Sequence, residues 1–173
     1  MVVLMCNATT PALAAQAAGV SSISQELTQV PQLSVVENIF LGREITNGPL
    51  IDWKTMNARA RELLARVNAD FGEKTEVKKL SIAHRQMVEI AKALSMNARI
   101  IVMDEPTSSL TPHETEKLFA IIESLKAEGK GIVFISHHLE EIKEIGDRAT
   151  VLRDGKYIST FDVKDRTIEE IIE

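Results

Sequence analysis

The apolar run Ile100–Met103 constrains the fold more than any other stretch, because no polar residue alternates with the apolar ones. A strand with one solvated face alternates, whereas a strand buried on both faces of a parallel sheet does not. The run leads directly into Asp104, Glu105 and Pro106. We therefore expect a buried parallel strand that presents two carboxylates at its carboxyl end, the edge where ligands bind in open α/β sheets.

Strand and helix patterns alternate around this run. Residues 131–135 form a second unbroken apolar run, expected as another buried strand, and residues 20–24 form a short strand leading to Gln25. Ser81 precedes an amphipathic helix pattern, and Thr111 opens another with a capping box and a proline at the first helical position. Further helices are expected at residues 10–19, 57–67 and 138–145 and from Thr167 onward, and a hairpin with an Asp154-Gly155 turn is expected at residues 149–161.

This alternation predicts an α/β fold with a mainly parallel sheet. The block from residue 31 to 95 interrupts it with helix patterns, so we interpret that block as an inserted helical subdomain. Residues 1–30 and 96–173 then form the α/β lobe. A chain of 173 residues, 45% of them hydrophobic, is long enough to bury such a core.

Charge and cysteine content exclude several classes of function. The net charge is −5 and no dense Lys/Arg run occurs, so a nucleic-acid partner is not expected. The single cysteine, Cys6, excludes an internal disulfide framework and fits a reducing compartment. No apolar run is long enough to span a bilayer, and the opening residues lack the basic flank of a secretion signal. We expect a cytoplasmic chain that reaches a membrane only through a partner.

Two of the predicted strand ends carry the side chains of a phosphate site. One carboxylate of Asp104 and Glu105 could hold Mg²⁺ while the other positions an attacking water. The plain alternative is a surface turn after a core strand. His137 follows the second strand and could contact a γ-phosphate or that water. Its alternative is a helix-capping region, with Ser136 as the cap and two exposed histidines in the first turn.

Two further positions could support such a site. Gln25 stands at the end of a predicted strand, where an amide oxygen can ligate Mg²⁺ or orient water, although it is also an ordinary polar loop residue. Ser81 opens a helix whose free N–H groups form a natural anion site. The alternative there is a plain N-cap.

One component of a nucleotide site has no match in the sequence. A phosphate-binding loop needs the pattern G-x-x-x-x-G-K-[ST]. Of the eight glycines, only Gly129 and Gly155 precede a lysine, and neither has a glycine five residues earlier. Gly131 and Tyr157 occupy the positions where serine or threonine is required.

The order of these features resembles the ATPase domain of ABC transporters, and most closely the first of the two cassettes in ribose-, galactose- and xylose-type sugar importers. The similarity runs from about Pro11 to the end. The segments that carry it are "ISQEL", similar to the Q-loop; "LSIAHRQMVEIAKAL", similar to the signature; "IIVMDEPTSSLT", similar to the Walker B strand and D-loop; "ISHH", similar to the H-loop; and "DRATVLRDGKYIST", similar to the strands that close the cassette.

The resemblance implies a role for each matching residue. Asp104 and Gln25 would hold Mg²⁺, Glu105 would polarise the attacking water, and His137 would contact the γ-phosphate of ATP. Residues of the signature and D-loop would face nucleotide: Ser81, Ile82, Ala83, His84 and Ser109. Many cassettes have two glycines where Ile82 and Ala83 stand, and the "LSIA" form is what points to the first sugar-importer cassette.

The resemblance also implies a fold and partners. The fold is a P-loop NTPase-like ABC ATPase fold, incomplete at its N-terminus, because the Walker A loop and the adenine-stacking aromatic residue that precedes it have no match. The partners are a second cassette, in tandem or as a dimer, the transmembrane permease subunits and, indirectly, a periplasmic sugar-binding protein. The location is the inner face of the cell membrane, reached through the permease.

The missing loop leaves enzymatic activity of the chain by itself open, and we expect weak ATP binding. Two other classes remain. One is a non-catalytic remnant or interaction fragment of such a subunit. The other is a cassette ATPase that acts on DNA or ribosomes, which a coiled-coil or basic insertion in the helical block would indicate, and neither is found.

Overall fold

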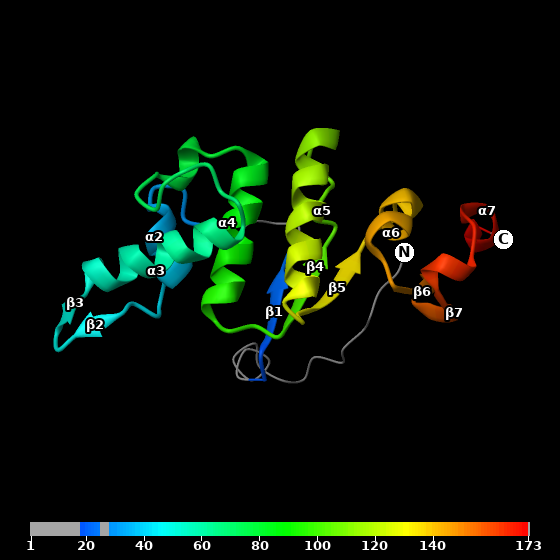
Figure 1. Ribbon diagram of the computed structural model, residues 1–173, viewed down its shortest axis with the longest axis horizontal. Coiled ribbons are helices and arrows are strands. Elements are labelled where there is room, and N and C mark those ends of the chain that lie inside the picture. Colours follow the sequence, from blue (N-terminus) through cyan, green and yellow to red (C-terminus); the bar gives the residue numbers. More distant parts are fainter. Residues whose placement is uncertain (1–17, 25–27, 173) are drawn as a thin grey trace.

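A parallel three-stranded sheet forms the centre of the fold in the computed structural model, which describes residues 18–24 and 28–172. Its strands are β1 (Val20–Ile23), β4 (Ile100–Asp104) and β5 (Gly131–Ile135), in the order β1-β4-β5. Both pairings are parallel, and the register places Met103 beside Ile23 and Asp104 beside Ile135. Figure 1 shows the three arrows pointing the same way. The predicted mainly parallel α/β sheet is confirmed.

Helices of the described chain bury one face of this sheet. Ile101 and Met103 are fully buried and belong to a core cluster that also contains α4 (Ile82–Ser95) and α5 (Pro112–Ala127). Ile100 is 41% exposed, although it lies in the same unbroken apolar run. The expectation that this strand is buried on both faces is therefore wrong for the described residues. Its side chains alternate between a covered face and an open one.

Strand β5 was expected to be buried, and the structure differs. Its residues Ile132 to Ile135 are only half-buried. The physical reason is its position, because β4 is the only described strand that pairs with it and the described helices pack against one of its faces.

The block between β1 and β4 consists of helices and one short hairpin. Helices α2 (Val35–Phe40), α3 (Trp53–Arg66) and α4 pack on one another, and the hairpin of β2 (Thr46–Asn47) and β3 (Leu50–Ile51) extends from them (Figure 1). Helix α3 begins earlier than predicted because the Asp52 side chain accepts a hydrogen bond from the Thr55 N–H (3.0 Å). A 3₁₀ turn, η1 (Val77–Lys79), precedes α4.

Helices α4 and α5 follow their predicted patterns. The apolar stripe of each is buried, and Thr111 and Glu114 form the predicted capping box of α5. Gly129 follows the end of α5 with φ +79°, a left-handed conformation that glycine adopts without strain. The buried stripe residues are Met87, Ile90, Ala91 and Leu94 on α4 and Leu118, Ile121, Ile122 and Leu125 on α5.

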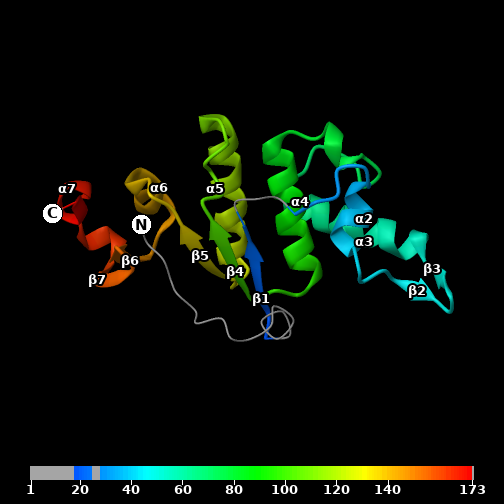
Figure 2. The same ribbon diagram turned by 180° about the vertical axis from the view of Figure 1, so that it is seen from behind.

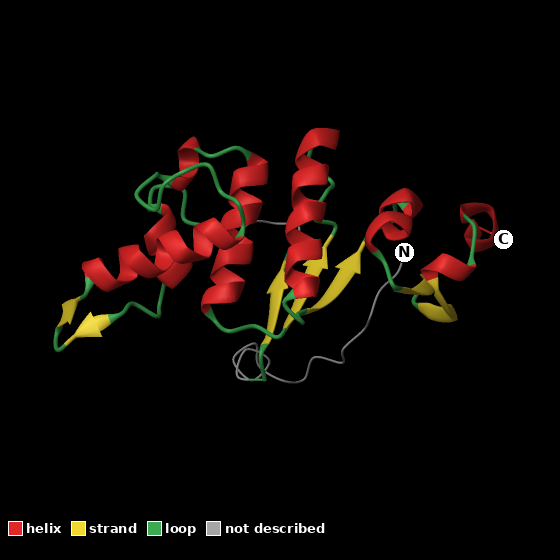
Figure 3. Cartoon of the chain, in the orientation of Figure 1, coloured by secondary structure: helices red, strands yellow, loops and turns green. Residues whose placement is uncertain are grey.

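The C-terminal part forms a second sheet and a second, smaller core. Helix α6 (Leu139–Ile145) leads to the antiparallel pair β6 (Arg148–Arg153) and β7 (Lys156–Asp162), followed by η2 (Val163–Asp165) and α7 (Ile168–Ile172). Asp154 and Gly155 both have positive φ, which confirms the predicted hairpin turn. Ile142, Ala149 and Val163 form the smaller cluster, and Phe134 of β5 packs against both clusters. Figures 2 and 3 show this region beyond β5, opposite the helical block.

Two expectations fall outside the described residues: the helix at residues 10–19 and the position of Gln25. Within the described part, none of the helices has the length and the hydropathy that crossing a bilayer requires.

Candidate functional site

Glu105 and His137 meet at the carboxyl edge of the sheet. Strands β4 and β5 run parallel with Asp104 opposite Ile135, so the residues that follow each strand emerge side by side. The His137 Nδ1 atom lies 3.0 Å from the Glu105 Oε1 atom. The Glu105 side chain is one-quarter exposed, and that of His137 is more than half exposed. The contact brings together two residues that are 32 positions apart in the sequence.

The backbone also holds Glu105 in place. Its N–H donates to the Ile135 carbonyl (2.9 Å), and its carbonyl accepts from the Ser108 N–H (3.2 Å). Its φ is +45°, in the left-handed region that a residue with a side chain rarely adopts. Such a conformation costs on the order of 1–3 kcal/mol and persists where surrounding contacts enforce it, often at functional sites.

Ser136 shapes the turn that presents His137. It is buried, its hydroxyl donates to the Glu141 carboxylate (2.6 Å), and it accepts from the His138 N–H (3.0 Å). Helix α6 begins at Leu139 with His138 as the N-cap residue. The alternative that made Ser136 the cap, with both histidines in the first helical turn, is therefore wrong. The turn leaves the His137 ring stacked on that of His138, with ring centres 4.1 Å apart.

Asp104 presents an unpaired carboxylate next to this pair. It is the last residue of β4 and is exposed, and its side chain has no hydrogen-bond or ion-pair partner among residues 18–24 and 28–172. In the same residues, no group of three or more His, Cys, Asp or Glu side chains could hold a metal ion. Magnesium is commonly held by one or two carboxylates together with substrate phosphates and waters. A single free carboxylate at this edge therefore fits Mg²⁺ that arrives with a nucleotide.

The predicted signature residues lie at the start of α4. The Ser81 hydroxyl caps the helix by accepting from the His84 N–H (3.2 Å). Ser81 and Ile82 are exposed, whereas the Ala83 side chain is buried and leaves only its backbone to offer to a ligand. In the described part, no hydrogen bond or ion pair joins these residues to Glu105 or His137.

Asp70 and Phe71 support this segment, and the sequence patterns did not single them out. The Asp70 Oδ1 atom lies 3.0 Å from the His84 Nε2 atom, and the Phe71 ring centre lies 5.0 Å from the imidazole centre. Both residues belong to a loop without helical or strand periodicity, so only a three-dimensional structure could show their contact with His84.

Ser109 lies between β4 and α5. Its side chain is exposed, in a turn closed by the hydrogen bond from the Leu110 N–H to the Thr107 carbonyl (3.0 Å). Three of the predicted site residues, Asp104, Glu105 and His137, therefore follow the ends of the neighbouring strands β4 and β5. The other described site residues lie elsewhere in the chain, Ser109 in the turn before α5 and Ser81 to His84 at the start of α4. Gln25 lies outside the described residues.

Comparison with known proteins gives matches in both sequence and structure. Residues 5–108 match the family model described as "ABC transporter". A putative ribose/galactose/methyl galactoside import ATP-binding protein of Burkholderia cenocepacia is 57% identical over 91% of the chain and 31% of its own length. A ribose import ATP-binding protein of Streptomyces avermitilis is 57% identical over 83% of the chain and 27% of its length. The chain thus spans about a third of these curated relatives.

Solved structures show the same fold at low sequence identity. A nucleotide-free ATP-binding cassette from an ABC transporter matches 92% of the chain and 65% of its own, with a TM-score of 0.72 and 24% identity. An inward-facing putative metal-chelate type ABC transporter matches 88% and 62%, with a TM-score of 0.75 and 20% identity. A dimeric cassette bound to ADP and phosphate matches 83% and 62%, with a TM-score of 0.69 and 24% identity.

Proposed function

This chain belongs to the ABC transporter family, and we propose from that premise that it is the ATP-binding part of an importer for a monosaccharide. Relatives that are 57% identical bear the names of ribose and galactose import ATP-binding proteins, which supports the substrate class. The chain has the P-loop NTPase-like fold of ATP-binding cassettes. Its function would be to couple ATP hydrolysis to transport.

The observation that carries this proposal is the contact of Glu105 with His137 beside the free carboxylate of Asp104. A general base needs hydrogen-bond reach to the proton it removes and a fixed orientation. The N–H, the carbonyl and one carboxylate oxygen of Glu105 each have a hydrogen-bond partner. That leaves its Oε2 atom available for an attacking water.

In ATP hydrolysis, each residue at the sheet edge would have its own role. The Glu105 carboxylate would accept the hydrogen bond of the attacking water and take its proton. The exposed imidazole of His137 would donate to a γ-phosphate oxygen while its Nδ1 atom faces Glu105. Asp104 and Gln25 would hold Mg²⁺, which supplies positive charge against the phosphates when bound. Most of the catalysis then comes from positioning and charge stabilisation.

Partner proteins would complete the site. The start of α4 (Ser81, Ile82, Ala83 and His84) and Ser109 would face nucleotide across a second cassette. The transmembrane permease would dock near Gln25 and the helical block, residues 31–95, which we propose as a subdomain distinct from residues 1–30 and 96–173. The packing of α2, α3 and α4 on one another supports that division. The permease would keep the chain at the cytoplasmic face of the membrane and receive sugar from a periplasmic binding protein.

A second candidate function is that of a non-catalytic interaction fragment of such a subunit. It is favoured by the absence of a G-x-x-x-x-G-K-[ST] loop from the sequence. Without the lysine and the N–H groups of that loop, several charge-assisted hydrogen bonds to phosphate are lost, each on the order of 1.5–3 kcal/mol. Calorimetric titration of the 173-residue chain with Mg-ATP is expected to give a Kd in the millimolar range. A micromolar Kd would count against the fragment function.

The Glu105→Gln variant tests the enzymatic proposal in a cassette that joins this chain to a phosphate-binding loop. Glutamine keeps the size of the side chain but cannot take a proton. We expect ATP hydrolysis to fall by about 10²–10⁴-fold, the usual contribution of a general base, with ATP binding retained. The matched control is Glu140→Gln, since Glu140 is an exposed residue of α6. Equal hydrolysis by the two variants would remove Glu105 from its assigned role.

A further inference from the structure

The turn between β2 and β3 contains the pair Asn47-Gly48. In the sequence, each of the other five asparagines is followed by alanine or isoleucine, so this is the only one that a glycine follows. Strand β2 ends at Asn47, β3 begins at Leu50, and these two residues pair across the hairpin. Gly48 and Pro49 therefore form its two-residue loop. The hairpin projects from the end of the helical block (Figure 1).

Both groups that a ring closure in this turn would join are accessible. Asn47 and Gly48 are exposed. Within the described part of the chain, no hydrogen bond involves the Asn47 side-chain amide or the Gly48 N–H. Apart from the neighbouring residues of the chain, no heavy atom lies within 4 Å of the position that a Cβ of Gly48 would occupy. Because glycine has no Cβ, its backbone nitrogen is open to a close approach.

The ring closes between the Gly48 backbone nitrogen and the Asn47 side-chain carbon Cγ. Hydroxide takes the proton of the nitrogen, the nitrogen attacks Cγ, and the Nδ2 group leaves with a proton from water as ammonia. The product is a five-membered succinimide. Water then breaks the new N–Cγ bond to give aspartate, or the original N–C bond to give isoaspartate. Water is the only co-reactant, and no group is oxidised or reduced.

Local opening of the hairpin gives Asn47 the backbone conformation for this attack, which the extended backbone of a paired strand does not provide. Two residue pairs, one of them Asn47 with Leu50, hold the hairpin together. At its base, the Asp52 N–H also donates to the Ile45 carbonyl (2.8 Å). A two-stranded hairpin is marginally stable by itself, and segments with so few contacts open at little cost in free energy. The turn therefore opens while the helices of the block stay folded.

We propose that Asn47 is a site of spontaneous deamidation, which proceeds through a succinimide with Gly48 to aspartate and isoaspartate. Either product adds a negative charge to the hairpin. Isoaspartate also lengthens the backbone by one carbon, so the register that pairs residue 47 with Leu50 is lost. The modification does not depend on the proposed function, because it needs only this turn and water.

Incubation of the unaltered 173-residue chain at 37 °C and pH 8 tests the proposal. Trypsin then cuts after Arg43 and Lys54, which places Asn47 in the peptide EITNGPLIDWK together with the only tryptophan of the chain. Chromatography followed by the absorbance of that tryptophan separates the asparagine, aspartate and isoaspartate forms. Mass spectrometry identifies the replacement of NH₂ by OH. Asn68 and Asn97 are internal references, because both are exposed and both precede alanine.

We expect Asn47 to react about tenfold faster than Asn68 and Asn97, because alanine shields its backbone nitrogen and glycine does not. Both aspartate and isoaspartate should appear at Asn47, and the rate should rise with hydroxide concentration from pH 7 to pH 8.

Two variants separate the ring closure from the opening of the turn. In Gly48→Ala, the φ of +62° strains the turn and favours its opening, whereas the added Cβ hinders the attack, so we expect a rate about tenfold lower. Asn47→Gln keeps an exposed amide but would need a six-membered ring, and its peptide should release no ammonia over the same time.

Three results would contradict the proposal. Reaction of Asn47 no faster than that of Asn68 and Asn97 would show that the hairpin protects it. Aspartate without isoaspartate would indicate direct hydrolysis instead of a succinimide. A Gly48→Ala variant that reacts as fast as the unaltered chain would remove the Gly48 nitrogen from its assigned role.

Discussion

At the scale of single residues, the site depends on side chains that hold other side chains. Glu105 accepts from His137, but the direction of His137 is set by the turn at Ser136. Ser136 is buried, and its hydroxyl group makes two hydrogen bonds. It donates to the Glu141 carboxylate and accepts from the His138 N–H. It thus connects the start of α6 to the sheet edge that carries Glu105 and His137.

Ser136→Ala removes both bonds and leaves Glu141 without its donor. We expect the free energy of unfolding to fall by about 1–3 kcal/mol, the cost of unsatisfied buried polar groups. Urea denaturation would measure it, and the His137 imidazole resonances should broaden because its turn loosens. Ser124→Ala is the matched control, since Ser124 is exposed on α5, and it should change stability by less than about 0.5 kcal/mol. Equal effects of the two substitutions would show that Ser136 has no structural role.

At the scale of elements, helix α5 depends on the capping box at its start. The Thr111 N–H and hydroxyl both donate to the Glu114 carboxylate (2.9 Å each), and the Thr111 oxygen accepts from the Glu114 N–H (3.4 Å). Five buried residues of α5 belong to the main core, so fraying of its first turn would weaken the packing against the sheet.

Thr111→Ala is expected to lower the free energy of unfolding by about 1 kcal/mol, because the cap is lost. For a chain of this size, calorimetry should show a fall of roughly 2–4 °C in Tm. Thr115→Ala, one turn further on, is the control: Thr115 caps nothing, and alanine has the higher helix propensity. A control variant as unstable as Thr111→Ala would contradict the capping explanation.

Elements with strong local patterns were predictable, and contacts between elements were not. The strand ending at Asp104, the helix after Ser81 and the Asp154-Gly155 turn all follow from spacing and turn chemistry. The unbroken apolar runs predicted buried strands, the one at Ile100–Met103 buried on both faces, but burial depends on what covers a strand, which no local pattern contains. The left-handed backbone of Glu105 was equally hidden, because a residue before proline favours extended backbone.

In the candidate site, too, positions along the strands were predictable and contacts between a loop and a helix were not. Parallel neighbouring strands were enough to bring Glu105 and His137 to one edge. The contact of Asp70 with His84 joins a loop to a helix across 14 positions, and no spacing rule predicts it.

At the scale of the whole molecule, ionised carboxylates stabilise the fold. Glu73 shows the effect most clearly: the hydrogen bond from Arg61 lowers the pKa of Glu73, although its burial acts in the opposite direction. In the other cases a hydrogen bond is again the main cause of the lowered pKa, and the groups are Asp52, Glu76, Glu114 and Glu169.

Stability should therefore fall in acid. Because each folded-state pKa lies below the ordinary value, 3.8 for Asp and 4.5 for Glu, the unfolded chain binds more protons as the pH drops. The stabilisation is fully present above about pH 5 and is lost as the pH falls through the folded pKa values. Thermal unfolding between pH 3 and 7 would measure it. Glu73→Gln should reduce the slope below about pH 5, and an unchanged slope would exclude Glu73 as a contributor.

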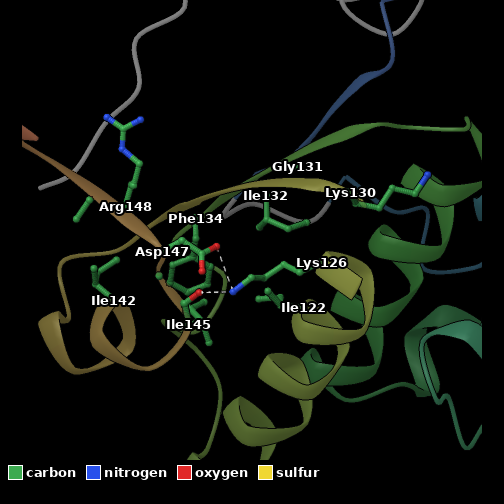
Figure 4. A pocket seen from close by; sticks show the side chains of 12 residues that line it. Ile122, Lys126, Lys130, Gly131, Ile132, Phe134, Ile142, Ile145, Asp147 and Arg148 are labelled. Carbon is green, nitrogen blue, oxygen red and sulfur yellow. Dashed lines mark hydrogen bonds and ion pairs between the residues drawn. The ribbon is translucent and has the colours of Figure 1, made fainter. Parts of the chain in front are cut away.

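The division of the core into two clusters joined through Phe134 has a consequence for motion. Cooperative opening follows contiguous packed units, so the segment from β6 onward can unfold transiently while the parallel sheet and its helices stay closed. Such an opening would leave one side of the Phe134 ring without its packing partners, at a point three residues before His137. Transient unfolding of the C-terminal segment would thus change the packing of Phe134 (Figure 4) and, through it, the position of His137.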